Sequence, residues 1–268
     1  MSDFWAGRRV LITGISGFIG ANLSRALLAA GADVACRSLP AGQLKAVVLA
    51  SSNHVFGSLN PGAVPAGAPY PAVRQDSART AWLEDDPCGA TDVYGISKGC
   101  ADLLARAYGA MGLPVVALRH VNAFGEADPH RSHIVTGTIC DLLEGKVPVI
   151  RGDGTAIKGY LAVENVVAAY QLLAEGLYDG RIEAGSAWNA APDGPISVIA
   201  LVDLICQVAG HDAVPEILGV DLGQSYYVEH LDSSRLRVLG WSPSRLEVGL
   251  RETWNWYKAH GGALWLTR

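Results

Sequence analysis

The chain has 268 residues, of which half are apolar and 18% are charged, and its formal net charge at pH 7 is −5. No apolar run approaches the ~18 residues that a membrane-spanning helix needs, and the high apolar content excludes long-range disorder. The acidic balance leaves no basic excess for nucleic acid, so we expect neither nucleic acid nor a membrane as a partner.

The first half of the chain alternates short apolar runs with helical stretches. Residues 10–13 form a run typical of a buried strand, and residues 20–30 carry apolar side chains at helical spacing. Further strands are predicted at 46–50 and 115–119, apolar throughout as burial on both faces requires, with a helix over 102–111 between them. This alternation predicts an α/β fold with a largely parallel sheet.

Residues 58–80 are rich in proline, glycine and alanine and lack periodicity, which predicts an exposed loop and a candidate lid. After residue 126 the pattern changes to helices with sparse strands. The candidate helices are 134–145, 165–177, 197–209 and 246–259. We therefore expect a dinucleotide-binding domain at 1–126 and a smaller, mainly helical substrate lobe at 127–268, some of whose strands could return to the main sheet.

The start of the chain and its cysteines indicate a cytoplasmic protein. Residues 1–9 lack the apolar core of a secretory signal peptide. The cysteines are odd in number and show no CxxC spacing, and we interpret them as reduced core residues. They are Cys36, Cys88, Cys100, Cys140 and Cys206.

A glycine-rich loop at 13–20 joins the first predicted strand to a helix, with the spacing GxxGxxG. In such a loop one glycine makes the turn, one lets a diphosphate approach backbone N–H groups, and one lets helix and strand pack closely. This position between strand and helix favours a dinucleotide site. The candidate cofactor-binding residues are Gly14, Gly17, Phe18, Ile19 and Gly20.

The acidic residue expected about 20 positions beyond such a loop is absent. Asp33 comes too early, in the turn before the second strand, and Arg37 ends that strand instead. Arg37 is a further candidate cofactor contact. It could meet the 2′-phosphate of NADP, stack on adenine or be a surface residue, and the sequence leaves these three interpretations open.

Tyr94 and Lys98 are four residues apart, which places them on one face of a predicted helix. A cation beside a phenol lowers the pKa of the phenol and makes it useful as an acid or base near neutral pH. The pair follows a strand that ends in Ser51 and Ser52. With the glycine-rich loop upstream, these signals indicate a functional site rather than a chance pattern.

On these motifs the chain resembles the extended short-chain dehydrogenase/reductase family, the nucleotide-sugar epimerases and dehydratases, and most of all the branch around CDP-glucose 4,6-dehydratase. The similar stretches are FWAGRRV at 4–10, EDDP at 84–87, DVY at 92–94, SKGCA at 97–101, RHVNAFG at 119–125, GDGT at 152–155 and LGWSP at 239–243. The resemblance implies a Rossmann-like parallel sheet and NAD as cofactor, with NADP as the alternative.

By this resemblance, Ser52, Tyr94 and Lys98 are the catalytic residues. Tyr94 would remove a proton from a sugar hydroxyl as hydride passes to the nicotinamide, and Ser52 would hydrogen-bond the reacting oxygen. Lys98 would lower the pKa of the tyrosine and hold the nicotinamide ribose.

The resemblance also implies binding residues. His120 lies in a family motif and is a candidate cofactor contact, while Asn122 and Lys158 lie where the family contacts the substrate diphosphate. Other interpretations remain open: Ser52 could bond only backbone, Asn122 could form a turn, and Lys158 could be a solvated surface charge.

The sequence departs from the sugar 4,6-dehydratases after Ser52. Those enzymes typically carry an aspartic acid and then a glutamate or lysine, which protonate the leaving C6 hydroxyl and remove the C5 proton. Here the two positions hold Asn53 and His54, both candidate substrate contacts. Asn53 cannot donate an acid proton, whereas His54 could act as a base because an unperturbed histidine has a pKa near 6.5.

A second departure is a missing length of chain. Family members carry two more strand–helix units before the strand that leads to the catalytic serine, yet only residues 38–43 separate Arg37 from Leu44. A parallel crossover needs at least ~10–12 residues, so no helix fits. Either the sheet is abbreviated, with strand 46–50 beside the first strand, or the sequence lacks residues of the natural chain. In both cases cofactor affinity is the most vulnerable expectation.

We therefore expect an NAD(P)-dependent nucleotide-sugar epimerase or dehydratase that works through transient C4 oxidation, with epimerisation preferred because of Asn53. One alternative is a CDP-glucose-type 4,6-dehydratase with a rearranged acid/base pair, and another is a catalytically weakened paralogue that serves as a binding or scaffold subunit. The helix over 92–111 has an apolar face with Leu103, Leu104 and Ala107, and together with the resemblance it predicts a homodimer. We expect no metal.

Overall fold

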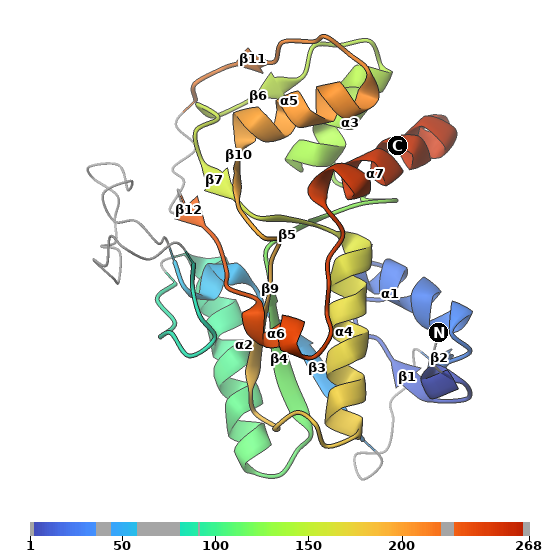
Figure 1. Cartoon of the computed structure of the whole chain (residues 1–268), viewed down its shortest axis with the longest axis vertical. Coiled ribbons are helices and arrows are strands. Elements are labelled where there is room, and N and C mark those ends of the chain that lie inside the picture. Colours follow the sequence, from blue (N-terminus) through green and yellow to red (C-terminus); the bar gives the residue numbers. More distant parts are fainter. Residues whose placement is uncertain (1–2, 36–43, 58–80, 91, 221–227, 265–268) are drawn as a thin grey trace.

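The computed structural model describes residues 3–35, 44–57, 81–90, 92–220 and 228–264 (Figure 1). The predicted loop at 58–80, Arg37 and Cys36 lie outside these residues.

The N-terminal unit consists of a 3₁₀ turn, η1 (Asp3–Trp5), two strands and a helix. Strands β1 (Arg9–Leu11) and β2 (Asp33–Ala35) pair in parallel across helix α1 (Phe18–Ala29). This is the strand–helix–strand crossover that the apolar run and the helical spacing predict. The unit has its own small core, whose buried members are Trp5, Ile12, Leu27 and Ala32.

A central parallel sheet has the order β3-β4-β9, from β3 (Val47–Ala50), β4 (Val115–His120) and β9 (Ala187–Ala190). Helix α2 (Val93–Ala110) packs on β4, while α4 (Val163–Tyr178) packs on β3 and β4, and Figure 1 shows the sheet between the two helices. Coverage by helices explains why β4 is apolar and buried over most of its length.

The two sets of parallel strands are not joined by a ladder among the described residues, since β1 pairs with β2 and β3 pairs with β4. Instead α1 packs on α4, and the indole N–H of Trp5 donates a hydrogen bond to Glu175 Oε1 at 2.8 Å. The expectation that strand 46–50 lies beside the first strand is thus not met by hydrogen-bonded pairing in the described chain, because the N-terminal unit is attached through its helix.

The second half of the chain contributes to both the central sheet and a separate core. Strands β5 (Asn122–Phe124) and β8 (Tyr160–Ala162) pair in parallel. Helices α3 (Ile134–Leu143), α5 (Val198–Ala209) and α7 (Leu246–Leu264) pack together around a second apolar cluster. The division at residue 126 stays a prediction, and both α4 and β9 from the second half pack with the central sheet.

Short elements from both halves of the chain complete the fold and the pocket described below. Parallel β6 and β11 form one pair, and β10-β7-β12 form a three-stranded sheet in which β7 and β12 are parallel. These elements are η3 (Asn53–Val55), β6 (Val149–Ile150), β7 (Ile157–Lys158), β10 (Ile196–Ser197), β11 (Glu216–Ile217), β12 (Val228–Glu229) and α6 (Ser234–Val238).

The cysteine expectation needs a correction. Cys140 and Cys206 are buried, but Cys88 and Cys100 are exposed. Cys88 lies in an irregular segment and Cys100 on the outward side of α2, so neither belongs to the core. The helices predicted at 134–145, 165–177, 197–209 and 246–259 are present as α3, α4, α5 and α7.

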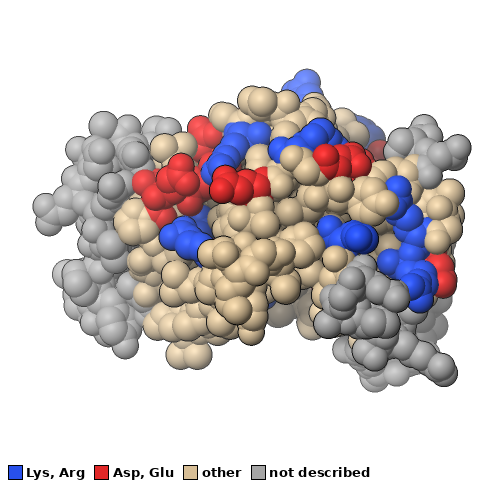
Figure 2. Space-filling view, turned by 90° about the horizontal axis from the view of Figure 1, so that it is seen from below, with Lys and Arg blue, Asp and Glu red and all other residues tan. Residues whose placement is uncertain are grey.

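The described helices include none long and apolar enough to cross a membrane. On the face in Figure 2, basic and acidic side chains alternate in the upper part and a wide uncharged area lies below them. Further basic side chains gather at the right of this face, beside an acidic one.

Candidate active site

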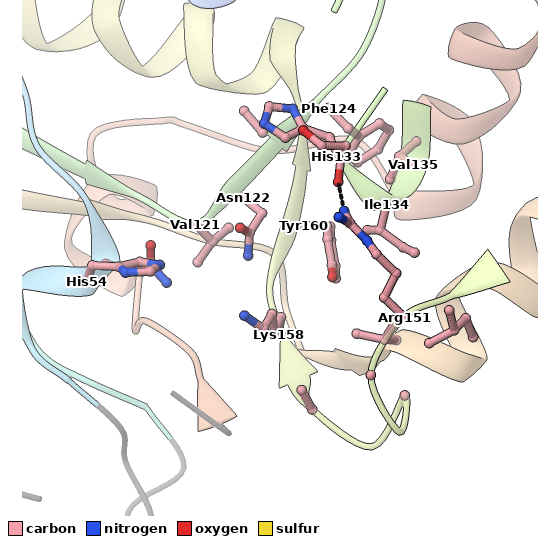
Figure 3. A pocket seen from close by; sticks show the side chains of 18 of the residues that line it. His54, Val121, Asn122, Phe124, His133, Ile134, Val135, Arg151, Lys158 and Tyr160 are labelled. Atoms are coloured by element: carbon pink, nitrogen blue, oxygen red, sulfur yellow. Dashed lines mark hydrogen bonds between the residues drawn. The ribbon is translucent and has the colours of Figure 1, made fainter. Parts of the chain in front are cut away.

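A pocket of about 700 Å³ lies at the carboxyl ends of β3 and β4 and extends between α3 and β7 (Figure 3). Nine of the predicted site residues line it: Phe18, Ile19, Ser52, Asn53, His54, Tyr94, His120, Asn122 and Lys158. Gly14, Gly17, Gly20 and Lys98 are not among its lining residues. The pocket therefore collects residues from the N-terminal unit, the central sheet and the lobe.

The glycine-rich loop has the geometry that its spacing predicts. Gly14 has a φ of +72°, in the left-handed region that favours glycine. A Cβ on Gly20 would lie 2.2 Å from the carbonyl oxygen of Gly14, so the first turn of α1 closes on the loop only with glycine there. Gly17 is the N-cap of α1. The loop thus leaves the positive end of the α1 dipole open beside the pocket, a geometry that fits a diphosphate.

Ser52 is buried at the end of β3 and caps η3. Its Oγ accepts a hydrogen bond from the His54 backbone N–H at 3.2 Å and donates to Asn53 Oδ1 at 3.3 Å. The serine therefore has a structural role in the cap and also lines the pocket.

Tyr94 and Lys98 lie on the first two turns of α2, which Asp92 caps by accepting from the Gly95 N–H at 2.8 Å. A Cβ on Gly95 would lie 2.6 Å from the His54 carbonyl oxygen, so this glycine lets α2 approach η3 closely. Lys98 Nζ lies 5.7 Å from the Tyr94 ring centroid and donates to the Ala50 carbonyl at 3.0 Å. The helix thus brings the phenol and the ammonium to the end of β3.

A buried ion pair fixes α2 on the sheet. Arg119, in β4, pairs with Asp102 of α2 and donates to the Glu84 carbonyl at 2.9 Å. The guanidinium also lies over the Phe56 ring, 4.7 Å from its centroid. The helix that carries Tyr94 is therefore anchored by charge as well as by apolar contact.

A buried carboxylate that no sequence motif marks, Glu229, is 3% exposed in β12. Its Oε2 accepts from Asn53 Nδ2 at 2.8 Å and its Oε1 accepts from Lys158 Nζ at 2.9 Å. His54 Nε2 lies 3.8 Å from Oε2, and His54 Nδ1 lies 3.5 Å from Asp92 Oδ2. The sole signal in the sequence was a lone acid in the run YYVEH at 226–230.

Three other predicted residues have defined surroundings. Asn122 Nδ2 donates to the Gly159 carbonyl at 3.1 Å and so ties β5 to β8. His120 Nδ1 lies 2.7 Å from the Val121 carbonyl. Burial lowers the pKa of His120 and the charge of Lys98 acts in the same direction, so its neutral form is favoured. Lys158 is not a solvated surface charge, because it pairs with Glu229.

The far end of the pocket carries two basic side chains that the sequence analysis did not select. Arg151 Nη2 donates to the Ser132 carbonyl at 2.9 Å, the contact dashed in Figure 3. His133 Nδ1 lies 2.7 Å from Oδ2 of the buried Asp128, and this hydrogen bond raises the pKa of His133. This end of the pocket is suited to an anionic group.

Comparison with known proteins gives consistent results. A trifunctional UDP-glucose 4,6-dehydratase/UDP-4-keto-6-deoxy-D-glucose 3,5-epimerase/UDP-4-keto-L-rhamnose-reductase of Arabidopsis thaliana is 31% identical over 173 residues, 62% of this chain and 25% of that protein. CDP-glucose 4,6-dehydratase of Salmonella typhimurium is 26% identical over 195 residues, 66% of this chain and 53% of that protein. The chain thus spans about a quarter and about half of the length of these two relatives.

The fold is that of a solved dTDP-glucose 4,6-dehydratase from Bacillus anthracis in complex with NAD. The TM-score is 0.76 at 18% identity, over 97% of this chain and 99% of that chain. A sequence model described as the NAD dependent epimerase/dehydratase family matches residues 35–190. Because that match covers more than half of the chain, the protein belongs to the NAD dependent epimerase/dehydratase family, with a Rossmann-like α/β fold.

Proposed function

We propose that this protein is an NAD(P)-dependent enzyme that modifies a nucleotide-activated sugar through transient oxidation at C4. One observation carries the proposal: a single pocket is lined by Ser52, Tyr94 and the start of α1, with Lys98 beside Tyr94. The family and the nucleotide-sugar enzymes among its relatives support the same chemistry.

The glycine-rich loop is the proposed site for the dinucleotide diphosphate, with Phe18 and Ile19 at the pocket wall. A bound nicotinamide supplies the acceptor for hydride. In the reacting complex, Tyr94 takes the proton of the C4 hydroxyl and Ser52 hydrogen-bonds the same oxygen. Lys98, held by the Ala50 carbonyl, keeps a positive charge beside the phenol.

The rest of the pocket is the proposed substrate site. A volume of about 700 Å³ lies within the range of ligand pockets, ~300–1,000 Å³. Asn122 and Lys158 would contact the diphosphate, and Arg151 gives the far end a positive charge, with His133 beside it. Asn53 and His54 would lie at the sugar.

Epimerisation, or another step that needs the 4-keto sugar, is the preferred reaction because Asn53 holds no acidic proton. The second candidate is 4,6-dehydration, and the names of the relatives favour it. A catalytically weakened scaffold subunit is the third, motivated by the short stretch after Arg37. NAD is the proposed cofactor and NADP the alternative, and Arg37, which could meet the 2′-phosphate of NADP, lies outside the described residues.

A homodimer is the proposed assembly. Leu103 and Leu104 on α2 are 58% and 56% exposed, and Ala107 one turn further is also exposed. Covering these side chains with a second copy of the helix would remove apolar surface from water. Light scattering at micromolar concentration tests this, and a monomeric mass contradicts it. The cytoplasmic location stays a prediction.

Isothermal titration with NAD(H) and NADP(H) tests the enzyme proposal. We expect binding of at least one dinucleotide, and no binding by Gly17→Asp, which puts a negative charge at the N-terminus of α1 where the diphosphate would lie. Absence of heat and of any thermal shift at millimolar dinucleotide would favour the scaffold alternative.

A further inference from the structure

Glu229 is buried behind the pocket wall, where it contacts two of the lining residues, Asn53 and Lys158. It lies directly opposite Lys158 in the parallel β12–β7 ladder, and its backbone carbonyl accepts from the Gly159 N–H at 3.1 Å. In the view of Figure 3, Lys158 lies between His54 on one side and Arg151 on the other. The ladder therefore holds the carboxylate behind the pocket wall, where it reaches both Asn53, next to Ser52, and Lys158.

We propose that Glu229 is a positioning residue of this active site, which fixes the amide of Asn53 beside Ser52 and restrains the charge of Lys158. The inference rests on the proposed function, because Ser52 and Lys158 have their catalytic and binding roles only there.

Glu229 determines the orientation of the Asn53 amide. An ionised carboxylate only accepts hydrogen bonds, so Asn53 must turn its NH₂ group toward Glu229. The carbonyl end of the same amide then faces Ser52 and accepts from its hydroxyl at 3.3 Å. Without substrate, Glu229 thus sets, through one amide, the direction in which the Ser52 proton points, and the hydroxyl turns to the C4 oxygen only in the reacting complex.

Glu229 also restrains the charged end of Lys158. Its ammonium has three donors, and one of them is bound to Glu229 Oε1 at 2.9 Å, with the carboxylate side chain only 2% exposed. The other two donors can reach a ligand. Because Glu229 is buried and negative, it attracts Lys158 and repels an anionic ligand at the same place. Glu229 therefore lowers the affinity for a diphosphate, while it orients Asn53 and Ser52.

Removal of the Glu229 charge should therefore strengthen nucleotide binding and at the same time slow turnover. Glu229→Gln removes the negative charge with little change of volume, and its NH₂ group favours the opposite orientation of the Asn53 amide. We expect the dissociation constants of UDP, CDP and dTDP to fall about three- to tenfold for whichever of them bind, and kcat to fall at least tenfold. A residue with a merely structural role would weaken binding as stability falls.

The matched control is Glu84→Gln. Glu84 is also a buried carboxylate, and it accepts from the Asn189 N–H at 3.1 Å, away from the residues that line the pocket. We expect this variant to lower the melting temperature but to leave nucleotide affinity and kcat unchanged. A further control is Asn53→Ala: if Glu229 acts on kcat through Asn53, then Glu229→Gln adds little to the loss of kcat in that background.

The experiment combines titration of the three nucleoside diphosphates into wild type and Glu229→Gln with turnover of the nucleotide sugars. Tighter binding together with slower turnover supports the proposal. Weaker binding in proportion to lost stability, unchanged kcat, or no nucleotide binding by wild type overturns it. If wild type shows no turnover and Glu229→Gln still binds tighter, the restraint on Lys158 stands and the proposed function is what fails.

Discussion

The N-terminal unit and the central sheet are supported in different ways. β1 and β2 form a two-stranded unit with a small core, joined to the rest through the packing of α1 on α4 and the Trp5–Glu175 hydrogen bond. The central sheet carries η3 and α2, which are fixed by the buried Arg119–Asp102 pair. From this difference we expect proton-transfer geometry to depend on the buried ion pair, whereas cofactor affinity depends on a unit with its own core that joins the rest through α1.

The largest expected effect is a loss of turnover on substitution of Tyr94, which lies on α2 beside the central sheet. Tyr94→Phe removes the group that accepts the hydroxyl proton, so we expect turnover to fall by roughly 10²–10⁴-fold. The ring is 52% exposed, and therefore stability and dinucleotide binding should change little. Product formation, titration and thermal melting together check this. A variant that keeps more than a tenth of wild-type turnover would remove Tyr94 from the mechanism.

The next largest expected effect is a loss of dinucleotide affinity on substitution in the glycine-rich loop, which belongs to the N-terminal unit. Gly20→Ala puts a methyl group 2.2 Å from the Gly14 carbonyl oxygen, so the loop must shift. We expect dinucleotide affinity to fall at least tenfold, measured by titration, while the melting of the central sheet stays unchanged.

Gly99→Ala is the matched control for that substitution. Gly99 lies in α2, and an added Cβ would meet nothing within 4 Å. Alanine is favoured over glycine inside a helix by about 0.5–1 kcal/mol, so this variant should melt slightly higher with unchanged affinity. Equal losses of affinity in both variants would contradict the role of the loop.

Asn53→Asp introduces an acidic group into η3, beside Ser52 and Glu229. The new carboxyl group would replace a donor that lies 2.8 Å from Glu229 Oε2, and two carboxyl groups that close retain one proton between them. That proton can protonate a departing C6 hydroxyl while His54, which also lines the pocket, removes the C5 proton, so we expect a product lighter by one water in the mass spectrum. Asn53→Asp combined with Glu229→Gln should lose it again. Loss of stability with no such product would show that the pair does not hold a usable proton.

The smallest effect concerns pH. The hydrogen bond from Asp128 raises the pKa of His133 above its ordinary value near 6.5. A raised folded-state pKa gives stability that is full below the unfolded value and is lost as the pH rises through the folded value. We expect the melting temperature to decline over that window, with a smaller decline in His133→Asn. Identical pH profiles of the two proteins would show that the contact contributes nothing.

Much of this organisation could be predicted from local sequence. Helices α2, α3, α4, α5 and α7 lie where the sequence predicts helices, and Tyr94 and Lys98 share a helical face because four residues make about one turn. The glycine-rich loop was also predictable, since Gly14 needs a left-handed φ and Gly20 a close approach to backbone.

What local sequence could not predict depends on pairing between distant strands. Glu229 reaches Lys158 only because β12 pairs with β7, 71 residues away in the chain. Arg151 and His133 line the same pocket, where the Arg151–Ser132 hydrogen bond joins the segment after β6 to the start of α3, and neither carries a motif. Likewise no periodicity encodes that α1 packs on α4 while β1 and β3 form no ladder among the described residues.

The central claim is C4 oxidation of a nucleotide sugar at this pocket, and deuterium at C4 tests it most directly. The protein with NAD or NADP is incubated separately with CDP-, UDP- and GDP-sugars that carry deuterium at C4, and products are followed by mass and NMR. The account predicts a product of unchanged mass, with inverted C4 and the deuterium retained, and no such product from Tyr94→Phe. A product lighter by one water would move the preference to dehydration. No change at C4 of any of these sugars, with dinucleotide bound, would contradict the claim.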